Sequence, residues 1–196
     1  GEMFVFNKNV NFSNPKQAIE KSIGMVFQHF MLIKNHTVAE NIILGTPGLL
    51  NLNLKNVKNE IREISERYDL YVDPEKKIQE LSVGEQQRVE IVKVLFRGAR
   101  ILILDEPTAV LTPQESEALY EIMQRMTEEN HSIIFITHKM KEVMALSHRI
   151  TVLSRGVRFL GGLACCCILR SCSSIQRRPN CRIKPTFRTF CSSSLL

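Results

Sequence analysis

Two adjacent carboxylates follow an apolar stretch in the second half of the chain. Residues 101–104 read ILIL, and Asp105 and Glu106 come directly after them. Such a run predicts a parallel strand that is covered on both faces, and ligands of open α/β sheets bind at the carboxyl ends of the strands. Because successive side chains of a strand point in opposite directions, we expect two tasks: one carboxylate on Mg²⁺ and one beside an attacking water. The structural alternative is an acidic pair that caps a helix after a core strand.

A second candidate site lies upstream, in the segment LSVGEQQRVEI at residues 81–91. Ser82 opens a helix, and Glu85 stands at the spacing of a capping box. The free backbone N–H groups and the positive dipole end at the start of a helix form a site for anions. Gly84 would let a phosphate approach the backbone closely. A capped amphipathic helix without a ligand is the alternative, and the closeness and order of the two motifs argue against it.

Hydrophobic periodicity and capping signals predict the elements that position these residues, and Thr37 with Glu40 and Thr112 with Glu115 have the spacing of further capping boxes. We expect strands at residues 1–10 (with a turn), 22–27, 101–104, 132–137 and 149–153, and helices at residues 15–20, from 37, and at 54–68, 82–96, 112–126 and 139–146. The alternation of strands and helices after residue 100 predicts a parallel α/β sheet. The helical block at about residues 37–97 predicts an inserted helical subdomain.

Charge and cysteine usage change together near residue 157. The chain has 26 basic and 20 acidic residues, and 7 of the basic residues but none of the acidic ones lie at 157–196. Residues 1–156 therefore carry a net charge of about −1, which gives no electrostatic basis for binding nucleic acid, and we expect no such partner. All six cysteines also follow residue 157. A body without cysteine fits a reducing compartment.

The segment 157–196 shows no pattern of a functional module. It has neither histidine nor a C-x-x-C pair, which argues against a zinc site, and a disulfide module conflicts with a reducing compartment. Its basic residues could bind phosphate backbones or anionic lipid. We instead expect a tail that is either disordered or an unrelated, out-of-frame sequence joined at about residue 157. We expect no signal peptide, and the apolar run at 159–169 is shorter than the roughly 20 residues of a membrane-spanning helix.

The two motifs together resemble those of the ATP-binding cassette (ABC) family. Residues 81–91 resemble its signature motif, and ILILDEPT at 101–108 resembles its Walker B strand. Gln28 in MVFQHF matches the Q-loop glutamine, and His138 in FITHK matches the switch histidine. A lone histidine at a strand end would otherwise be structural. The resemblance covers residues 1–156 and implies an α/β, P-loop NTPase-like nucleotide-binding domain, with a parallel core sheet and an inserted helical subdomain, incomplete at its N-terminus.

The resemblance also implies cofactors and roles. ATP and Mg²⁺ are the expected cofactors. Asp105 would help hold Mg²⁺, Glu106 would position or deprotonate the attacking water, and His138 would contact the γ-phosphate. Gln28 would contact the metal and couple the site to a membrane subunit.

The same resemblance implies partners. Two such domains pair head to tail, so that Ser82, Gly84 and Gln86 would contact ATP that is bound to a second ABC domain. Transmembrane permease subunits are the other expected partners, which would place the protein peripherally on the cytoplasmic face of the cell membrane.

Longer stretches point to a branch of the family and show two departures from it. Residues 23–45 and 105–115 resemble the first cassette of the tandem ATPases that drive simple-sugar and nucleoside importers. Thr112 stands where most of the family has an aspartate, which puts the usual contact of that aspartate across the dimer in doubt. The sequence contains no G-x-x-x-x-G-K-[ST] loop to hold the β- and γ-phosphates. We therefore expect that the chain begins after this loop and hydrolyses ATP negligibly by itself.

The functional prediction is an ATP-binding and ATP-hydrolysing subunit of an ABC importer for simple sugars or nucleosides. Two alternatives remain open. The chain could be a catalytically inactive fragment that still presents its signature face to a partner, or a cassette ATPase that serves DNA repair or translation. The segment that follows Gln28 favours transport, because importer cassettes meet their membrane partners there.

Overall fold

The computed structural model describes residues 2–46, 53–154, 157–163 and 187–192, with side chains up to residue 151. The chain divides into two compact units, Gly1–Leu102 and Ile103–Leu196. Among the described residues, no helix combines the length and apolar character that a bilayer crossing requires.

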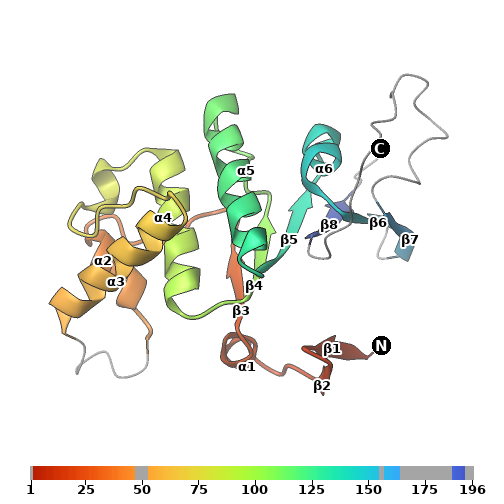
Figure 1. Ribbon diagram of the computed structural model, residues 1–196, viewed down its shortest axis with the longest axis horizontal. Helices are drawn as coiled ribbons and strands as arrows, with labels where there is room; N and C mark the ends of the chain where they lie inside the picture. Colours follow the sequence, from red (N-terminus) through yellow and green to blue (C-terminus); the bar gives the residue numbers. More distant parts are fainter. Residues whose placement is uncertain (1, 47–52, 155–156, 164–186, 193–196) are drawn as a thin grey trace. The chain divides into compact units, whose positions relative to one another are not determined.

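The first unit opens with a small hairpin and a short helix (Figure 1). Strands β1 (Met3–Val5) and β2 (Lys8–Val10) pair antiparallel, and Phe6 and Asn7 between them both have positive φ angles, as a tight hairpin turn requires. Helix α1 (Pro15–Glu20) follows, with Asn14 as its N-cap. Strand β3 (Ile23–Val26) comes next. All these elements lie within the ranges that the sequence predicts.

The helices predicted between residues 37 and 97 are present in the first unit. They are α2 (Val38–Ile43), α3 (Leu54–Arg67), the short 3₁₀ helix η2 (Ile78–Glu80) and α4 (Val83–Phe96). Helices α2, α3 and α4 contact one another and share a core that includes Ile42, Ile61 and Val89. The three- and four-residue spacing of apolar residues from Leu54 to Tyr68 predicts one buried face on α3, and for Leu54 this prediction is wrong, because Leu54 is 52% exposed. Ser65 is buried there instead, where its hydroxyl accepts a hydrogen bond from the Val72 N–H.

Strand β3 lies very close to α4. A Cβ atom added to Gly24 would lie 2.0 Å from Val94 Cγ1 and 3.0 Å from Ala99 Cβ. The N–H groups of Arg100 and Ile101 both donate to the Ser22 carbonyl beside the start of β3. Glycine at position 24 is therefore a packing requirement for the helix that carries the signature motif.

The second unit is a sheet with helices packed on it. The boundary between the units falls within β4 (Ile101–Asp105), and the strand order continues through β5 (Ser132–Thr137), β8 (Phe187–Ser192), β6 (Arg149–Ser154) and β7 (Val157–Leu163). Strand β8 is parallel to both β5 and β6, and β7 is antiparallel to β6. Helix α5 (Pro113–Glu128) connects β4 to β5, and α6 (Met140–Leu146) connects β5 to β6.

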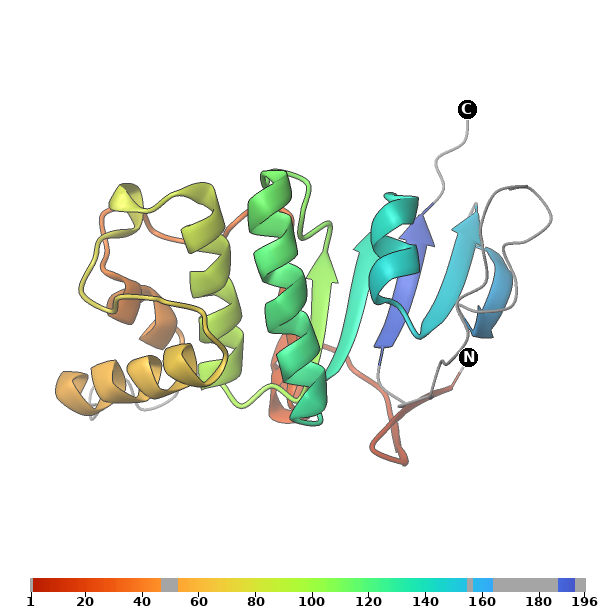
Figure 2. The same cartoon turned by 45° about the horizontal axis from the view of Figure 1, so that its top comes forward.

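Burial in this sheet differs from the expectation that both faces are covered. Leu104, Ile133 and Phe135 are fully buried, whereas the residues that alternate with them are half-buried. The reason is visible in Figure 2, where α5 and α6 lie on the same face of the strands. The spacing of apolar residues in α5 predicts a buried stripe that starts at Ala118; Ala118 is exposed, but the rest of the stripe is confirmed for Leu119, Ile122, Met123 and Met126.

The structure describes two strands after residue 156, where the sequence predicted no regular element. Strand β7 continues the chain antiparallel to β6, and β8 lies between β5 and β6. Residues 164–186 and 193–196, for which we predicted disorder, lie outside the described residues. The division of the chain at residue 156 therefore stays a prediction.

Candidate functional site

The chain turns sharply where strand β4 ends. Glu106 has a φ angle of 46°, in the left-handed region that few residues other than glycine adopt. Its N–H donates to the carbonyl of Ile136 on β5 at 2.9 Å, so that the turn is fixed by the neighbouring strand. Such a conformation costs roughly 1–3 kcal/mol and persists only where the surroundings impose it. Successive side chains of a regular strand point in opposite directions. Because of this turn, the side chains of Asp105 and Glu106 need not do so.

Two of the predicted site residues form a direct contact. His138 follows the last residue of β5, and its Nδ1 lies 2.7 Å from Glu106 Oε1. The side chains are 56% and 24% exposed, respectively, so the pair is open to solvent. Since Nδ1 faces the carboxylate, Nε2 stays available to a ligand. The sequence predicted both residues but not the bond between them.

The side chain of Asp105 is half-buried, and no hydrogen bond or ion pair joins its carboxylate to a described residue. A carboxylate with unoccupied oxygens suits Mg²⁺, which binds proteins through one or two carboxylates and fills its other positions with water and substrate phosphates. The donor chemistry at the end of β4 therefore fits the metal that the family implies.

The chain segments that carry Glu106 and His138 also take part in a buried polar network that the sequence did not predict. The carboxylate of Glu142 accepts hydrogen bonds from the hydroxyls of Thr108, at 2.5 Å, and Thr137, at 3.0 Å. Lys139 Nζ lies 3.4 Å from the same carboxylate and donates to the Thr108 carbonyl at 2.8 Å. The signal that could have revealed it is an acidic residue on the buried side of the short helix α6.

Tyr120 of α5 belongs to the same network. Burial raises the pKa of the Tyr120 hydroxyl to about 12, and the negative charge of Glu142 and a hydrogen bond to it act in the same direction. Glu142 therefore has polar neighbours from α5, α6, the end of β5 and the segment after β4.

The start of the signature helix α4 has the capping box that the sequence predicts. Ser82 Oγ accepts from the Glu85 N–H at 3.2 Å, and Glu85 Oε2 accepts from the Ser82 N–H at 2.7 Å. The hydrogen bond from the Ser82 backbone holds the pKa of Glu85 below its usual value. Gly84 is buried, and the Gln86 side chain donates to the Leu81 carbonyl at 3.0 Å. An anion bound at the start of α4 would occupy the same helix end as the carboxylate of Glu85.

The predicted residues are distributed over both units. Gln28 lies in an exposed bend after β3 and forms no hydrogen bond with a described residue. The first unit contains Gln28, Ser82, Gly84 and Gln86, and the second contains Asp105, Glu106 and His138. Within the second unit, the structure brings Glu106 and His138 together.

A buried ion pair in the first unit joins the segment after Gln28 to the signature helix. Glu90 of α4 accepts a hydrogen bond from the Met31 N–H at 2.8 Å and pairs with Lys93 at 3.0 Å. Lys93 Nζ also donates to the Met31 carbonyl at 3.2 Å, so the N–H and the carbonyl of Met31 both form hydrogen bonds with α4. The sequence offered one signal for this link, a glutamate and a lysine three residues apart on the apolar side of α4.

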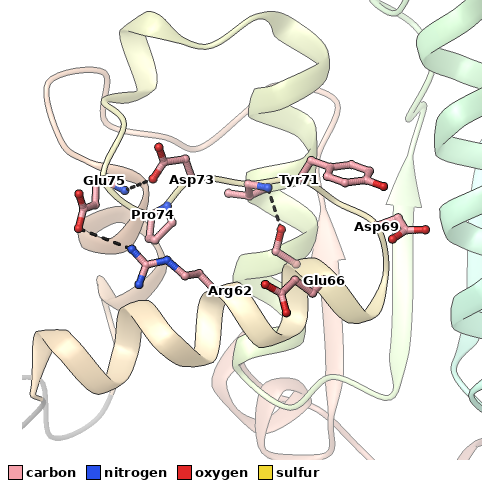
Figure 3. A pocket seen from close by; sticks show the side chains of 9 residues that line it. Arg62, Glu66, Asp69, Tyr71, Asp73, Pro74 and Glu75 are labelled. Carbon is pink, nitrogen blue, oxygen red and sulfur yellow. Dashed lines mark hydrogen bonds and ion pairs between the residues drawn. The ribbon is translucent and has the colours of Figure 1, made fainter.

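The first unit also has an open pocket of about 590 Å³ between α3 and the loop at residues 69–75 (Figure 3). Its charged groups contact one another: Arg62 lies 3.7 Å from Glu75, and the Glu75 N–H donates to Asp73 Oδ1 at 3.0 Å. None of the predicted site residues lines this pocket.

The fold, the Glu106–His138 pair and the capped signature helix define a nucleotide-binding cassette, and the chain belongs to the ABC transporter family, whose model matches residues 1–109. The chain is 55% identical over 159 residues to the nucleoside import ATP-binding protein NupA of Lactococcus lactis, covering 80% of this chain and 31% of that protein. It is 49% identical to the guanosine import ATP-binding protein NupO of Bacillus subtilis, with the same coverage. The chain thus spans about a third of the length of these relatives.

A solved structure shows the same fold. CbiO1 from Clostridium perfringens, part of the ABC transporter complex cbiONQ, superposes with a TM-score of 0.68 at 27% identity. The superposition covers 81% of this chain and 64% of cbiO1. The expected α/β cassette fold with a parallel sheet is therefore confirmed.

Proposed function

We propose that this chain is part of the ATP-binding subunit of an ABC importer for nucleosides or simple sugars, and that its second unit acts in ATP hydrolysis. The observation that carries the proposal is the 2.7 Å contact between His138 Nδ1 and Glu106 Oε1 at the ends of β5 and β4. The identity of 55% with a nucleoside import protein supports the transport role.

Glu106 acts on the attacking water. Its carboxylate accepts a proton as the water oxygen attacks the γ-phosphorus, and the bond from that phosphorus to the β,γ-bridging oxygen breaks to release ADP. His138 holds the carboxylate through Nδ1 and leaves Nε2 for the γ-phosphate. A general base must reach one water molecule, and the partial exposure of Glu106 leaves this access open.

Asp105 is the residue of the second unit that would hold Mg²⁺. A bound Mg²⁺ neutralises charge on the β- and γ-phosphate oxygens. Asp105 supplies a hard oxygen ligand without first breaking a contact within the described chain. The role of Gln28 as a metal contact stays a prediction, because Gln28 belongs to the other unit.

The start of α4 would bind ATP held by a second cassette. Ser82 and Gly84 lie in the first turn, where the dipole and free N–H groups favour phosphate. Gln86, which now donates to Leu81, would contact the same nucleotide after its side chain turns. A second ABC domain and permease subunits are the proposed partners.

The test uses a completed chain, which is the 196-residue chain preceded by the phosphate-loop segment of a related cassette. We expect Mg²⁺-dependent hydrolysis in the dimer. The Glu106→Gln substitution should lower the rate by about 100-fold or more, because it removes the base, while ATP binding persists. The control is Glu121→Gln, on the exposed side of α5. Unchanged turnover in Glu106→Gln would remove the basis of the proposal.

Transport is tested separately in Lactococcus lactis cells in which residues 1–156 replace the matching segment of NupA. We expect uptake of labelled nucleoside that is lost in Glu106→Gln. Hydrolysis without uptake of either nucleoside or simple sugar would favour a cassette outside this transport class. A completed chain that folds and dimerises but does not bind ATP would favour an inactive fragment.

A further inference from the structure

The second unit contains a buried carboxylate that has no part in the proposed reaction. Glu142 lies on the short helix α6 and is 6% exposed. A buried charge is costly unless it is paired and hydrogen-bonded, so its partners indicate what it holds.

Glu142 joins the two segments that carry the Glu106–His138 pair. Its Oε1 accepts from the hydroxyl of Thr108, two residues after Glu106, and its Oε2 accepts from the hydroxyl of Thr137, directly before His138. One rigid carboxylate therefore sets the spacing of the two chain segments. Glu106 and His138 are therefore each within two residues of a threonine that is hydrogen-bonded to Glu142.

Lys139 completes the anchor and balances its charge. Its Nζ donates to the Thr108 carbonyl at 2.8 Å and to the Thr108 hydroxyl at 3.2 Å, and lies 3.4 Å from Glu142 Oε1. Its N–H donates to the Thr137 hydroxyl at 3.1 Å. Tyr120 of α5 is also close enough to Glu142 for the negative charge of Glu142 to help raise the pKa of its hydroxyl. All these groups belong to the second unit.

The Glu106–His138 bond needs such an anchor. His138 is 56% exposed, and ion pairs and hydrogen bonds at an exposed position contribute little to holding two side chains together. The φ angle of 46° at Glu106 also requires a backbone that its surroundings fix. Hydrogen bonds to a buried charge are among the stronger ones in proteins. The buried network is thus the part that can define the geometry of the exposed pair.

We propose that Glu142 is a positioning residue that holds Glu106 and His138 at bonding distance. The proposal rests on the proposed function for its consequence in turnover, but the contact itself can be measured without nucleotide. A purely structural anchor would affect the stability of α6 and leave the Glu106–His138 bond unchanged.

The first experiment uses the 196-residue chain at one pH. The ¹⁵N chemical shift of His138 Nδ1 is recorded in the wild type and in Glu106→Ala, which gives the value without the carboxylate. In Glu142→Gln we expect the shift to move toward the Glu106→Ala value, whereas the matched control Glu121→Gln keeps the wild-type shift. A folded Glu142→Gln chain with the wild-type shift would overturn the proposal.

The second experiment measures hydrolysis by the completed chain. Glu142→Gln should lower kcat by about 10-fold to 100-fold and change the KM for ATP by less than about twofold, because the base is misplaced while nucleotide contacts persist. Equal kcat values for Glu142→Gln and Glu121→Gln would contradict the positioning role. If the wild-type completed chain binds ATP but does not hydrolyse it, the proposed function fails, and the Nδ1 shift still decides the role of Glu142.

A milder variant covers the case in which Glu142→Gln does not fold. Thr137→Val removes one of the hydroxyls that donate to the Glu142 carboxylate and keeps both Glu142 and Lys139. We expect the same direction of change in the Nδ1 shift and in kcat, and Thr137→Ser, which keeps the hydroxyl, should restore both. Wild-type values in Thr137→Val would overturn the proposal.

Discussion

His138 Nδ1 and Glu106 Oε1 lie 2.7 Å apart, although 32 positions separate the two residues in the chain. The contact links the end of β5 to the turn after β4, where the N–H of Glu106 is already bonded to β5. A base that is bonded at its backbone and at its side chain starts the reaction preoriented, which reduces the reorganisation that a proton transfer requires.

We predict that His138→Ala lowers ATP hydrolysis by the completed chain by about 100-fold, because one charge-stabilising donor is lost and Glu106 is released. ATP binding should persist. Steady-state hydrolysis and nucleotide binding are measured on the same preparation, with Lys141→Gln on the exposed side of α6 as the control. A loss no greater than that of the control would mean that the contact has no role in turnover.

The buried pair Glu90–Lys93 should contribute far more to stability than a surface pair of the same length. Its N–O distance is 3.0 Å, and its side chains are 5% and 12% exposed. Replacing Glu90 by alanine should cost about 3–5 kcal/mol, because it leaves a buried charge and the Met31 N–H without a partner. Urea unfolding measures the change.

The matched control is Lys58→Ala, which breaks the Lys58–Glu75 pair. That pair is also 3.0 Å long, but its side chains are 34% and 59% exposed. We expect a cost of at most about 1 kcal/mol. Equal costs for the two substitutions would show that burial does not determine the strength of the pair.

Gly24→Ala should destabilise the first unit by about 1–3 kcal/mol, because the added methyl overlaps Val94 and the packing must shift. The double variant Gly24→Ala/Val94→Ala frees the space that the methyl needs. Chemical denaturation of the four proteins of this cycle measures the coupling between the two sites. Additive costs would show that the two residues do not compete for this space.

The capping box of α4 should make stability depend on acid. Because the Ser82 backbone holds the pKa of Glu85 below its ordinary value of 4.5, the contribution of Glu85 is present above pH 4.5 and is lost as the pH falls through the lowered pKa. Glu85→Gln should remove this part of the pH dependence. At neutral pH, Ser82→Ala should cost about 1 kcal/mol.

The free energy of unfolding is measured by urea denaturation at several pH values on both sides of 4.5. The exposed substitution Glu60→Gln on α3 serves as the control. If Glu85→Gln retains the full acid sensitivity of the wild type, other carboxylates are responsible for it.

The parts of the fold that depend on neighbours in the chain could be predicted from the sequence. The capping boxes that begin at Thr37, Ser82 and Thr112 each involve residues three positions apart, and all are present. The helix at Pro15–Glu20 and the strand at Ser132–Thr137 have the predicted bounds. Local spacing carries this information because the groups concerned are brought together by one turn of helix or one strand.

Interactions between distant segments could not be predicted in this way. Glu142 reaches Thr108 across 34 positions, and Glu90 reaches Met31 across 59. The burial of alternate residues in β4 depends on the face on which α5 and α6 pack, which the apolar run at 101–104 does not encode. Strand β8 lies between β5 and β6, although no periodicity in residues 187–192 indicated it.

The left-handed backbone of Glu106 creates opposite requirements at one position: an unstrained fold favours another residue, whereas the proposed proton transfer requires a carboxylate. Glycine adopts this conformation without strain, and asparagine does so more readily than glutamate, so either would relieve the fold while ending proton transfer. Cassettes released from selection for turnover should therefore drift toward these residues here, whereas cassettes still under that selection should keep the carboxylate. In a library of variants of this chain that is sorted only for folding, we expect the glutamate at position 106 to be replaced before the other site residues.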